Sequence, residues 1–278
     1  MMKREGPDPL TAAASSRQQA MPGPQDELIK PLSGHSGSEV LLMRNDARGY
    51  FVRKIGDVAR NVERYDALRH LVDVPKVYRH DADADLLDMQ YIHGLDMVSY
   101  LLYEDLEPLL GFLTETLRRL QQSGKVANYR SVYEKKLQNI DFSAFGFPRE
   151  ALMERLPMQL VQSHYHGDFT LENIIFSKTD GKFYLIDPLT SDYDSVAFDL
   201  GKLQQDLRCG WFIRNKNVLL KSKLTRLYQG LADSFDLHRN DGQDNDHLLI
   251  AMLLRVYPYC KTSSDRDFII RNVRKLWK

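Results

Sequence analysis

The chain has 278 residues, of which 43% are hydrophobic and 27% charged, and this is enough for one large domain or two modest lobes. Its 38 Lys and Arg residues balance its 38 Asp and Glu residues, so no global charge favours a nucleic acid or an anionic membrane as partner. Only two cysteines occur, without metal-ligand spacing, and no apolar run reaches the length of a membrane span. We therefore expect a cytoplasmic protein without disulfides, a zinc site, a nucleic-acid partner or a membrane span.

The N-terminal segment, residues 1–26, is predicted to be a flexible, disordered leader. It lacks the apolar core of a signal peptide and has few residues that could build a hydrophobic core. Ordered patterning begins at residue 27. We expect an N-terminal lobe over 27–92 and a C-terminal lobe over 93–278.

The first of these parts is predicted to be a small sheet with one helix. The segments "ELIKPL", "EVLLMRN" and "GYFVRKI" have strand composition, and small residues at 33–38 and a turn at 46–49 separate them. Apolar residues recur at helical spacing over 58–72, which predicts one amphipathic helix. The stretch "KVYRHDADADLLDMQYI" indicates two more strands joined by an acidic turn.

The second part is predicted to be mostly helical. The segment "YLLYEDLEPLLGFLTETLRRLQQS" is apolar on one side, and we expect it to be helical with a break near Pro108. The pieces "NIIF" and "KFYLID" flank "SKTDG" and indicate a hairpin. Residues 196–275 are again predicted to be helical.

Three polar residues around this hairpin form the strongest functional pattern. Asp168 and Asn173 occur in "HGDFTLENIIF", and Asp187 stands fourteen positions after Asn173. The hairpin would fold back and bring Asp187 beside Asn173, which gives two hard oxygen ligands for Mg²⁺. Asp168 would then be left to face the hydroxyl group that receives a phosphoryl group from a nucleotide. Each residue alone would be explained by turn or capping chemistry.

The motifs "HGDFTLEN", "YLIDP" and "FDLGKL" together resemble the active-site core of the aminoglycoside phosphotransferase and choline kinase group, a branch of the protein-kinase-like superfamily. The resemblance implies an α+β, bilobal protein-kinase-like fold, with a small β-rich N-lobe and a larger helical C-lobe. It also implies the cofactors ATP and Mg²⁺, Asp168 as the catalytic carboxylate, Asn173 and Asp187 as metal ligands, and His166 as a loop-shaping residue. Asp199 is expected either to brace the catalytic loop or to be a helix N-cap.

Most residues of the predicted nucleotide site lie in the expected N-terminal lobe. The segment "SGHSGS" would cover the phosphates with Ser33, Gly34, Ser36, Gly37 and Ser38. Strand alternation puts Val52 and Lys54 on one face. In kinases the phosphate-holding lysine shares a face with a small apolar residue over the adenine, so the resemblance favours Lys54 over Arg53. Its partner acid is predicted to be Glu63, with Asp66 second. The adenine is expected to meet a connector and an apolar floor formed by Gln90, Tyr91, Ile92, Ile175 and Ile186.

The predicted acceptor is the hydroxyl group of a small molecule. Only twelve positions separate Asp187 from Asp199, which is shorter than the peptide-docking segment of protein kinases. Pro188-Leu189 replaces the Phe-Gly of those enzymes, and Gly167 stands where they usually carry Arg. We expect a sugar or sugar-like metabolite. The alternatives are an aminoglycoside or amino-alcohol kinase, a non-catalytic nucleotide-binding regulatory module and a noncanonical protein kinase.

Overall fold

A computed structural model describes residues 26–32, 38–214, 220–235 and 243–277. Its residues group into two compact units, the first made of 1–62 and 75–92, the second of 63–74 and 93–278. The mixed fold, with an antiparallel sheet in the N-terminal part and helices in the C-terminal part, is the predicted fold class. The predicted lobe boundaries stay a prediction.

The first unit is an antiparallel sheet whose described strands run in the order β1-β2-β3-β5-β4. Its strands are β1 (Glu27–Leu32), β2 (Glu39–Asn45), β3 (Gly49–Ile55), β4 (Val77–Asp81) and β5 (Leu86–Gln90). All five were predicted from β-branched and aromatic runs between turn residues. The central strand β3 pairs with β2 on one side and with β5 on the other. Residues on β3 are therefore held by two ladders of hydrogen bonds.

A buried ion pair fixes one side chain of β3. Arg53 is opposite Asp88 in the β3–β5 register. Its Nε and Nη2 atoms donate to the two Asp88 carboxylate oxygens at 2.7 and 2.8 Å, and both side chains are at most 2% exposed. Nη2 also donates to Asp26 Oδ2 at 2.9 Å. A bidentate pair of this kind holds the Arg53 guanidinium in a fixed position within the sheet.

The predicted helix over 58–72 is shorter in the structure. Helix α2 spans Ala59–Leu68, and Val72 is buried beyond its end, after a turn in which Leu71 N and Val72 N donate to Leu68 O. The apolar spacing continues past the helix because the turn also packs inward. Spacing alone does not distinguish these two cases.

The second unit contains two small described sheets. Strand β9 (Ile174–Ser177) lies between β10 (Phe183–Leu185) and β6 (Gly94–Asp96). The predicted hairpin is therefore formed, with a third strand that the sequence analysis did not identify. A two-stranded antiparallel sheet, β7 (Ser123–Asn128) with β8 (Gln159–Ser163), was not predicted either. Its strands are 30 residues apart in the chain, so no local turn signal marks the pairing.

The long helical segment breaks before its proline. Helix α3 (Met97–Tyr103) ends at Glu104, and α4 (Leu106–Leu120) begins two residues later. Pro108 thus lies in the first turn of α4, where its missing N–H costs no helical hydrogen bond. The prediction of a break near Pro108 is confirmed, and the break itself is at residues 104–105.

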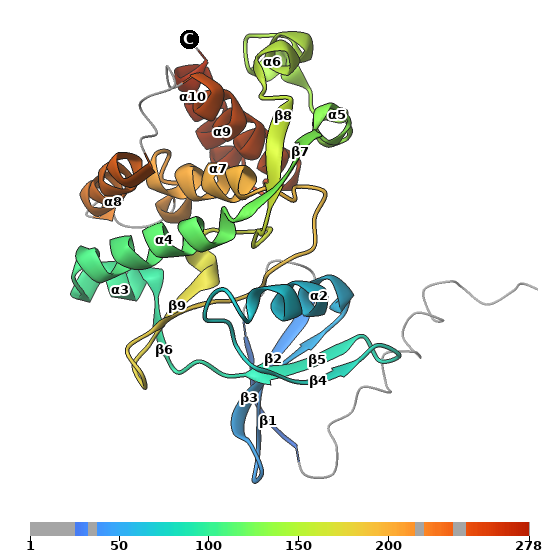
Figure 1. Cartoon of the computed structure of the whole chain (residues 1–278), viewed down its shortest axis with the longest axis vertical. Helices are drawn as coiled ribbons and strands as arrows, with labels where there is room; N and C mark the ends of the chain where they lie inside the picture. Colours follow the sequence, from blue (N-terminus) through green and yellow to red (C-terminus); the bar gives the residue numbers. More distant parts are fainter. Residues whose placement is uncertain (1–25, 33–37, 215–219, 236–242, 278) are drawn as a thin grey trace, which may run out of the picture. The chain divides into compact units, whose positions relative to one another are not determined.

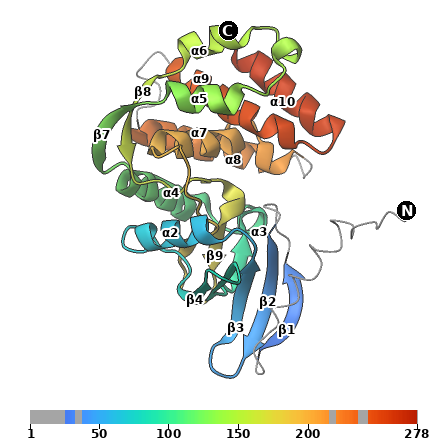
Figure 2. The same cartoon turned by 90° about the vertical axis from the view of Figure 1, so that its right-hand side faces the viewer.

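The remaining helices build two hydrophobic clusters. Those after β7 are α5 (Arg130–Leu137), α6 (Arg149–Arg155), α7 (Val196–Leu207), α8 (Leu220–Phe235), α9 (Gln243–Val256) and α10 (Ser263–Leu276), with 3₁₀ turns η2 (Phe142–Ala144), η3 (Leu171–Asn173), η4 (Trp211–Ile213) and η5 (Tyr257–Tyr259). One cluster joins α3, α4, α8 and the β9–β10 hairpin, and the other joins α5, α6, α9 and α10. Helix α7 contributes to both, with Leu203 in the first and Phe198 in the second. It lies between α4 and α9 in both views (Figure 1 and Figure 2). Within the described residues, no helix is long and apolar enough to cross a membrane.

Candidate active site

The loop that carries Asp168 is held by three buried polar side chains of α7. Asp199, Lys202 and Asp206 are three and four positions apart, so they share one face of the helix, and each is 1% exposed. Asp199 accepts hydrogen bonds from His166 N and, at 3.0 Å, from Gly167 N. Lys202 Nζ donates to Gly167 O, and Asp206 accepts from Leu171 N at 2.8 Å. Hydrogen bonds from three side chains of one helix therefore fix the backbone of this loop.

The structure decides between the two expectations for Asp199. Ser195 is the N-cap of α7, and its hydroxyl accepts from Ala197 N, whereas Asp199 lies inside the helix. The N-cap interpretation is therefore wrong, and the brace is confirmed. Lys202 and Asp206 were not predicted as part of it. Polar residues at i, i+3 and i+7 within "FDLGKLQQDL", a helix buried on both sides, are the signal that could have identified them.

His166 and Gly167 shape this loop in different ways. The His166 side chain is fully buried, and burial lowers its pKa although Asp199 and Asp168 oppose the effect, so the ring is neutral. Its Nδ1 accepts from Asp168 N at 3.3 Å, while Nε2 has no hydrogen-bond partner among the described residues. Gly167 has φ of 88°, and a Cβ there would lie 1.9 Å from Leu189 O. No other residue type fits this position without moving backbone.

Asp168 faces both an amide and two cations. Asn173 Nδ2 donates to its Oδ2 at 3.1 Å and to its backbone oxygen at 2.8 Å. Its Oδ1 is 3.7 Å from Lys202 Nζ and 3.6 Å from Arg255 Nη2. Burial raises the pKa of Asp168, but Lys202 and Arg255 outweigh it and hold the pKa below its usual value. The carboxylate is therefore ionised, and 31% of the side chain is exposed.

The hairpin brings Asp187 next to the start of β9. Ile186 N donates to Asn173 O at 2.9 Å, directly before Asp187. Asp187 has φ of 54°, an unfavourable conformation for a residue with a Cβ, and its N–H donates to Tyr65 Oη at 3.0 Å. Outliers of this kind concentrate at functional sites, where the surrounding structure maintains them.

The residues present fit Mg²⁺. Both hydrogen bonds of the Asn173 side chain use its amide nitrogen, so the amide oxygen remains as a potential ligand. Asp187 supplies a carboxylate on the adjoining segment. Mg²⁺ prefers such hard oxygen donors and usually takes only one or two from the protein, because phosphates and water complete its octahedron.

The predicted phosphate-covering loop is mostly outside the described residues. Ser33, Gly34, Ser36 and Gly37 are not described, and Ser38 directly precedes β2. On β3, Val52 is half-buried and Lys54 is 3% exposed, whereas Arg53 belongs to the ion pair with Asp88. Arg53 is therefore engaged within the sheet, and the role predicted for Lys54 stays a prediction.

The other predicted nucleotide-site residues are distributed over both units. Gln90 is the last residue of β5, and its N–H donates to Lys76 O, while Tyr91 and Ile92 follow directly and the Ile92 side chain is buried. In the second unit, Ile175 on β9 pairs with Tyr184, and Ile186 follows β10.

The predicted acid Glu63 accepts from Thr190 Oγ1 at 2.8 Å. Its alternative, Asp66, is exposed and lies 3.3 Å from Arg69 Nη1. The predicted pairing of either residue with Lys54 stays a prediction.

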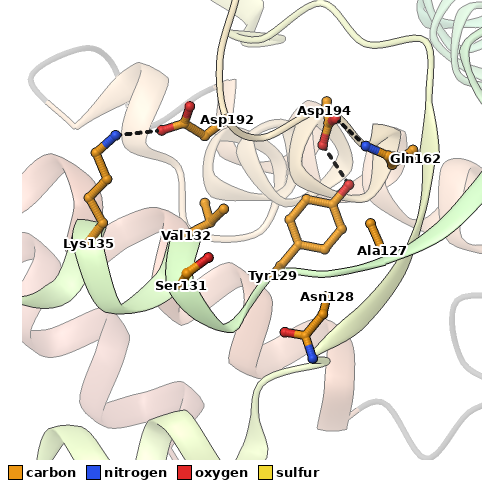
Figure 3. Close-up of a pocket in the computed structure, with 9 residues that line it drawn as sticks. All are labelled: Ala127, Asn128, Tyr129, Ser131, Val132, Lys135, Gln162, Asp192 and Asp194. Atoms are coloured by element: carbon orange, nitrogen blue, oxygen red, sulfur yellow. Dashed lines mark hydrogen bonds and ion pairs between the residues drawn. The ribbon is translucent and has the colours of Figure 1, made fainter.

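A shallow pocket of about 430 Å³ lies beside the segment that leads into the loop with Asp168 (Figure 3). Its lining comes from the β7–β8 sheet, α5 and the loop after β10. Asp194 accepts from Tyr129 Oη and Gln162 Nε2, both at 2.7 Å, and Asp192 accepts from Lys135 Nζ at 3.0 Å. Both carboxylates are thus already engaged by groups of the chain itself.

Comparison with known proteins gave one family and a set of shared folds. The sequence model of the phosphotransferase enzyme family matches residues 29–215 of this chain. Choline kinase LicA from Streptococcus pneumoniae superposes with a TM-score of 0.54 at 16% identity, covering 96% of this chain and 97% of that one. A glucosamine kinase superposes with a TM-score of 0.53 at 13% identity, covering 95% and 97%. A choline/ethanolamine kinase family protein from Mesorhizobium loti gives 0.51 at 18% identity, covering 96% and 93%. No curated protein sequence matches the chain.

Proposed function

The chain belongs to the phosphotransferase enzyme family, whose description covers two thirds of its length, and we propose that it transfers the terminal phosphoryl group of ATP to a hydroxyl group of a small molecule. A sugar or sugar-like metabolite is the proposed acceptor class. Choline, ethanolamine and glucosamine kinases share the fold, which supports a small acceptor without identifying it.

One observation carries this proposal. Asp168 is ionised, partly exposed and hydrogen-bonded to Asn173, while the hairpin that starts at Asn173 returns Asp187 to the same place. Phosphoryl transfer needs a carboxylate for the acceptor and oxygen ligands for a cation on the phosphates. These three side chains provide that set within one unit.

We assign Asp168 to the acceptor. Its carboxylate accepts a hydrogen bond from the hydroxyl and takes the proton as the acceptor oxygen bonds to the terminal phosphorus. The bond from that phosphorus to its bridging oxygen breaks, and ADP leaves. Because the pKa of Asp168 is lowered, orientation of the hydroxyl is its main contribution, and proton transfer follows late, as a loose transition state allows.

The remaining site residues hold the nucleotide and the metal. We propose Asn173 and Asp187 as the Mg²⁺ ligands; the ion, when bound, supplies positive charge to the phosphate oxygens. Lys54 is the proposed phosphate-binding cation, and residues 33–38 are proposed to cover the phosphates. His166 is proposed to keep the loop in shape through the hydrogen bond that Asp168 N donates to it.

The test is the Asp168→Asn variant, assayed for ATP consumption with a panel of sugars, amino alcohols and aminoglycosides. Turnover should fall by about 10²–10⁴-fold while the dissociation constant for ATP stays within about threefold. Asp180→Asn is the matched control, because Asp180 lies in the turn of the same hairpin and accepts from Tyr184 Oη. Retained turnover in Asp168→Asn would reject the assignment.

A further inference from the structure

The Arg255 guanidinium lies beside the Asp168 carboxylate and makes only one long contact with it. Arg255, near the end of α9, places Nη2 3.6 Å from Asp168 Oδ1, a single long contact. Its Nε is buried and has no hydrogen-bond acceptor in the described part of the chain. The side chain is 27% exposed, close to the 31% of Asp168. A ligand cannot reach the buried Nε, but the partly exposed Nη1 and Nη2 groups carry four N–H donors, enough to serve both Asp168 and a ligand beside it.

Two lysines make the same neighbourhood cationic. Lys202 Nζ is 3.7 Å from the same Asp168 oxygen. The ring of Tyr193 has Lys202 Nζ at 5.9 Å and Lys136 Nζ at 5.6 Å from its centroid. Positive charge of the chain is thus already placed beside this ring, and Tyr193 is only 3% exposed, so the ring offers little surface to the ammonium group of an acceptor.

Three carboxylates of the second unit already accept hydrogen bonds from the chain itself, whereas Asp187 is the proposed Mg²⁺ ligand and Glu172 is exposed. Asp199 is 1% exposed and accepts from loop N–H groups. Asp194 and Asp192 accept from Tyr129, Gln162 and Lys135. A polycationic acceptor would have to compete with these partners, weakly at the exposed pair of Asp192 and more strongly at Asp199 and Asp194.

The position of Arg255 limits what can sit next to the reacting hydroxyl. A hydroxyl that donates to Asp168 lies about 2.7 Å from a carboxylate oxygen. Substituents one or two bonds away then come within about 4–6 Å of the guanidinium. At that range an opposite charge is attracted and a like charge repelled strongly enough to change affinity about 10-fold to 100-fold. Arginine also matches carboxylate and phosphate groups in a bidentate geometry.

We propose that Arg255 determines acceptor specificity: it selects hydroxyl acceptors that carry a carboxylate or phosphate near the phosphorylated hydroxyl, such as an acidic sugar, and disfavours ammonium-bearing acceptors. This inference rests on the proposed function and narrows its acceptor class.

The experiment uses three probes with one scaffold: glucuronate, glucose and glucosamine. The full-length chain is assayed for kcat/KM with ATP, and for probe binding by calorimetry in the presence of a non-hydrolysable ATP analogue. We expect glucuronate to be preferred and glucosamine to be poorest in both measurements. Arg255→Gln should weaken glucuronate about 10-fold to 100-fold, mainly through KM, change glucose less than threefold and improve glucosamine. Arg119→Gln is the control, because Arg119 makes an exposed ion pair with Glu115 on α4.

Two results would overturn the inference. Glucosamine bound or phosphorylated better than glucuronate by the wild-type chain is one. An equal loss for all three probes in Arg255→Gln is the other, because it would make Arg255 a positioning residue for Asp168. Failure of the proposed function looks different: the chain binds nucleotide but phosphorylates no acceptor, while the binding order of the three probes still decides the role of Arg255.

Discussion

Gly167→Ala tests how the loop that carries Asp168 is held in place. The substitution adds one methyl group at φ of 88°, where the new Cβ would lie 1.9 Å from Leu189 O. Real Cβ atoms do not approach neighbours closer than 3.0 Å, so the loop or the segment after Asp187 must retreat by about 1.1 Å, the difference between the two distances. The atom it meets is backbone, which cannot rotate away.

The expected cost has two parts. A left-handed backbone costs a residue with a Cβ about 1–2 kcal/mol, and forcing extra volume into packed structure costs about 1–3 kcal/mol more. We expect the free energy of unfolding to fall by about 2–5 kcal/mol. Turnover should fall by at least about 10²-fold, because Asp168 directly follows the displaced residue and a shift of about 1 Å suffices for such a loss.

Gly181→Ala separates these two parts. Gly181 also has a positive φ, 70°, and a Cβ there would meet none of the described atoms within 4 Å. It should lose only the backbone cost and keep its activity. Urea unfolding and ATP consumption of both variants decide the matter. If Gly167→Ala loses no more stability than Gly181→Ala and turns over normally, the close approach to Leu189 does not constrain the site.

Three further substitutions test buried carboxylates, two on α7 that hold the Asp168 loop and one in the sheet of the first unit. Asp199→Ala leaves the His166 and Gly167 N–H groups buried without their acceptor and should lower the free energy of unfolding by about 2–3 kcal/mol by urea titration, together with turnover. Burial raises the pKa of Asp206 to about 8 from 3.8, so the folded state binds more protons between these values, and stability falls as pH rises from about 4 to 8. Asp206→Asn should flatten that slope in thermal unfolding. Asp88→Ala should cost about 3–5 kcal/mol in urea unfolding, because Arg53 stays buried without its bidentate partner; an unchanged midpoint would refute this.

The strands of the first unit were readable from the sequence because their signals are local. Apolar alternation and turn residues lie within each strand and its neighbours, and all five strands were predicted. The β7–β8 sheet was missed because its two strands are distant in the chain, with two helices between them, so no turn signal links them. The end of α2 was misplaced because Val72 is buried for a tertiary reason and not as part of the helix.

The sequence by itself determined the motif of Asp168, Asn173 and Asp187. A short loop and a hairpin separate these residues, and their lengths bring Asp187 back to the start of the hairpin. It could not determine what surrounds Asp168. Arg255 is 87 positions away and Lys202 is 34, and only the packing of α7 and α9 brings their charges to within 4 Å of one carboxylate oxygen. Electrostatic environment depends on distances in space, and the spacing of residues along a chain carries little information about distances between separate helices.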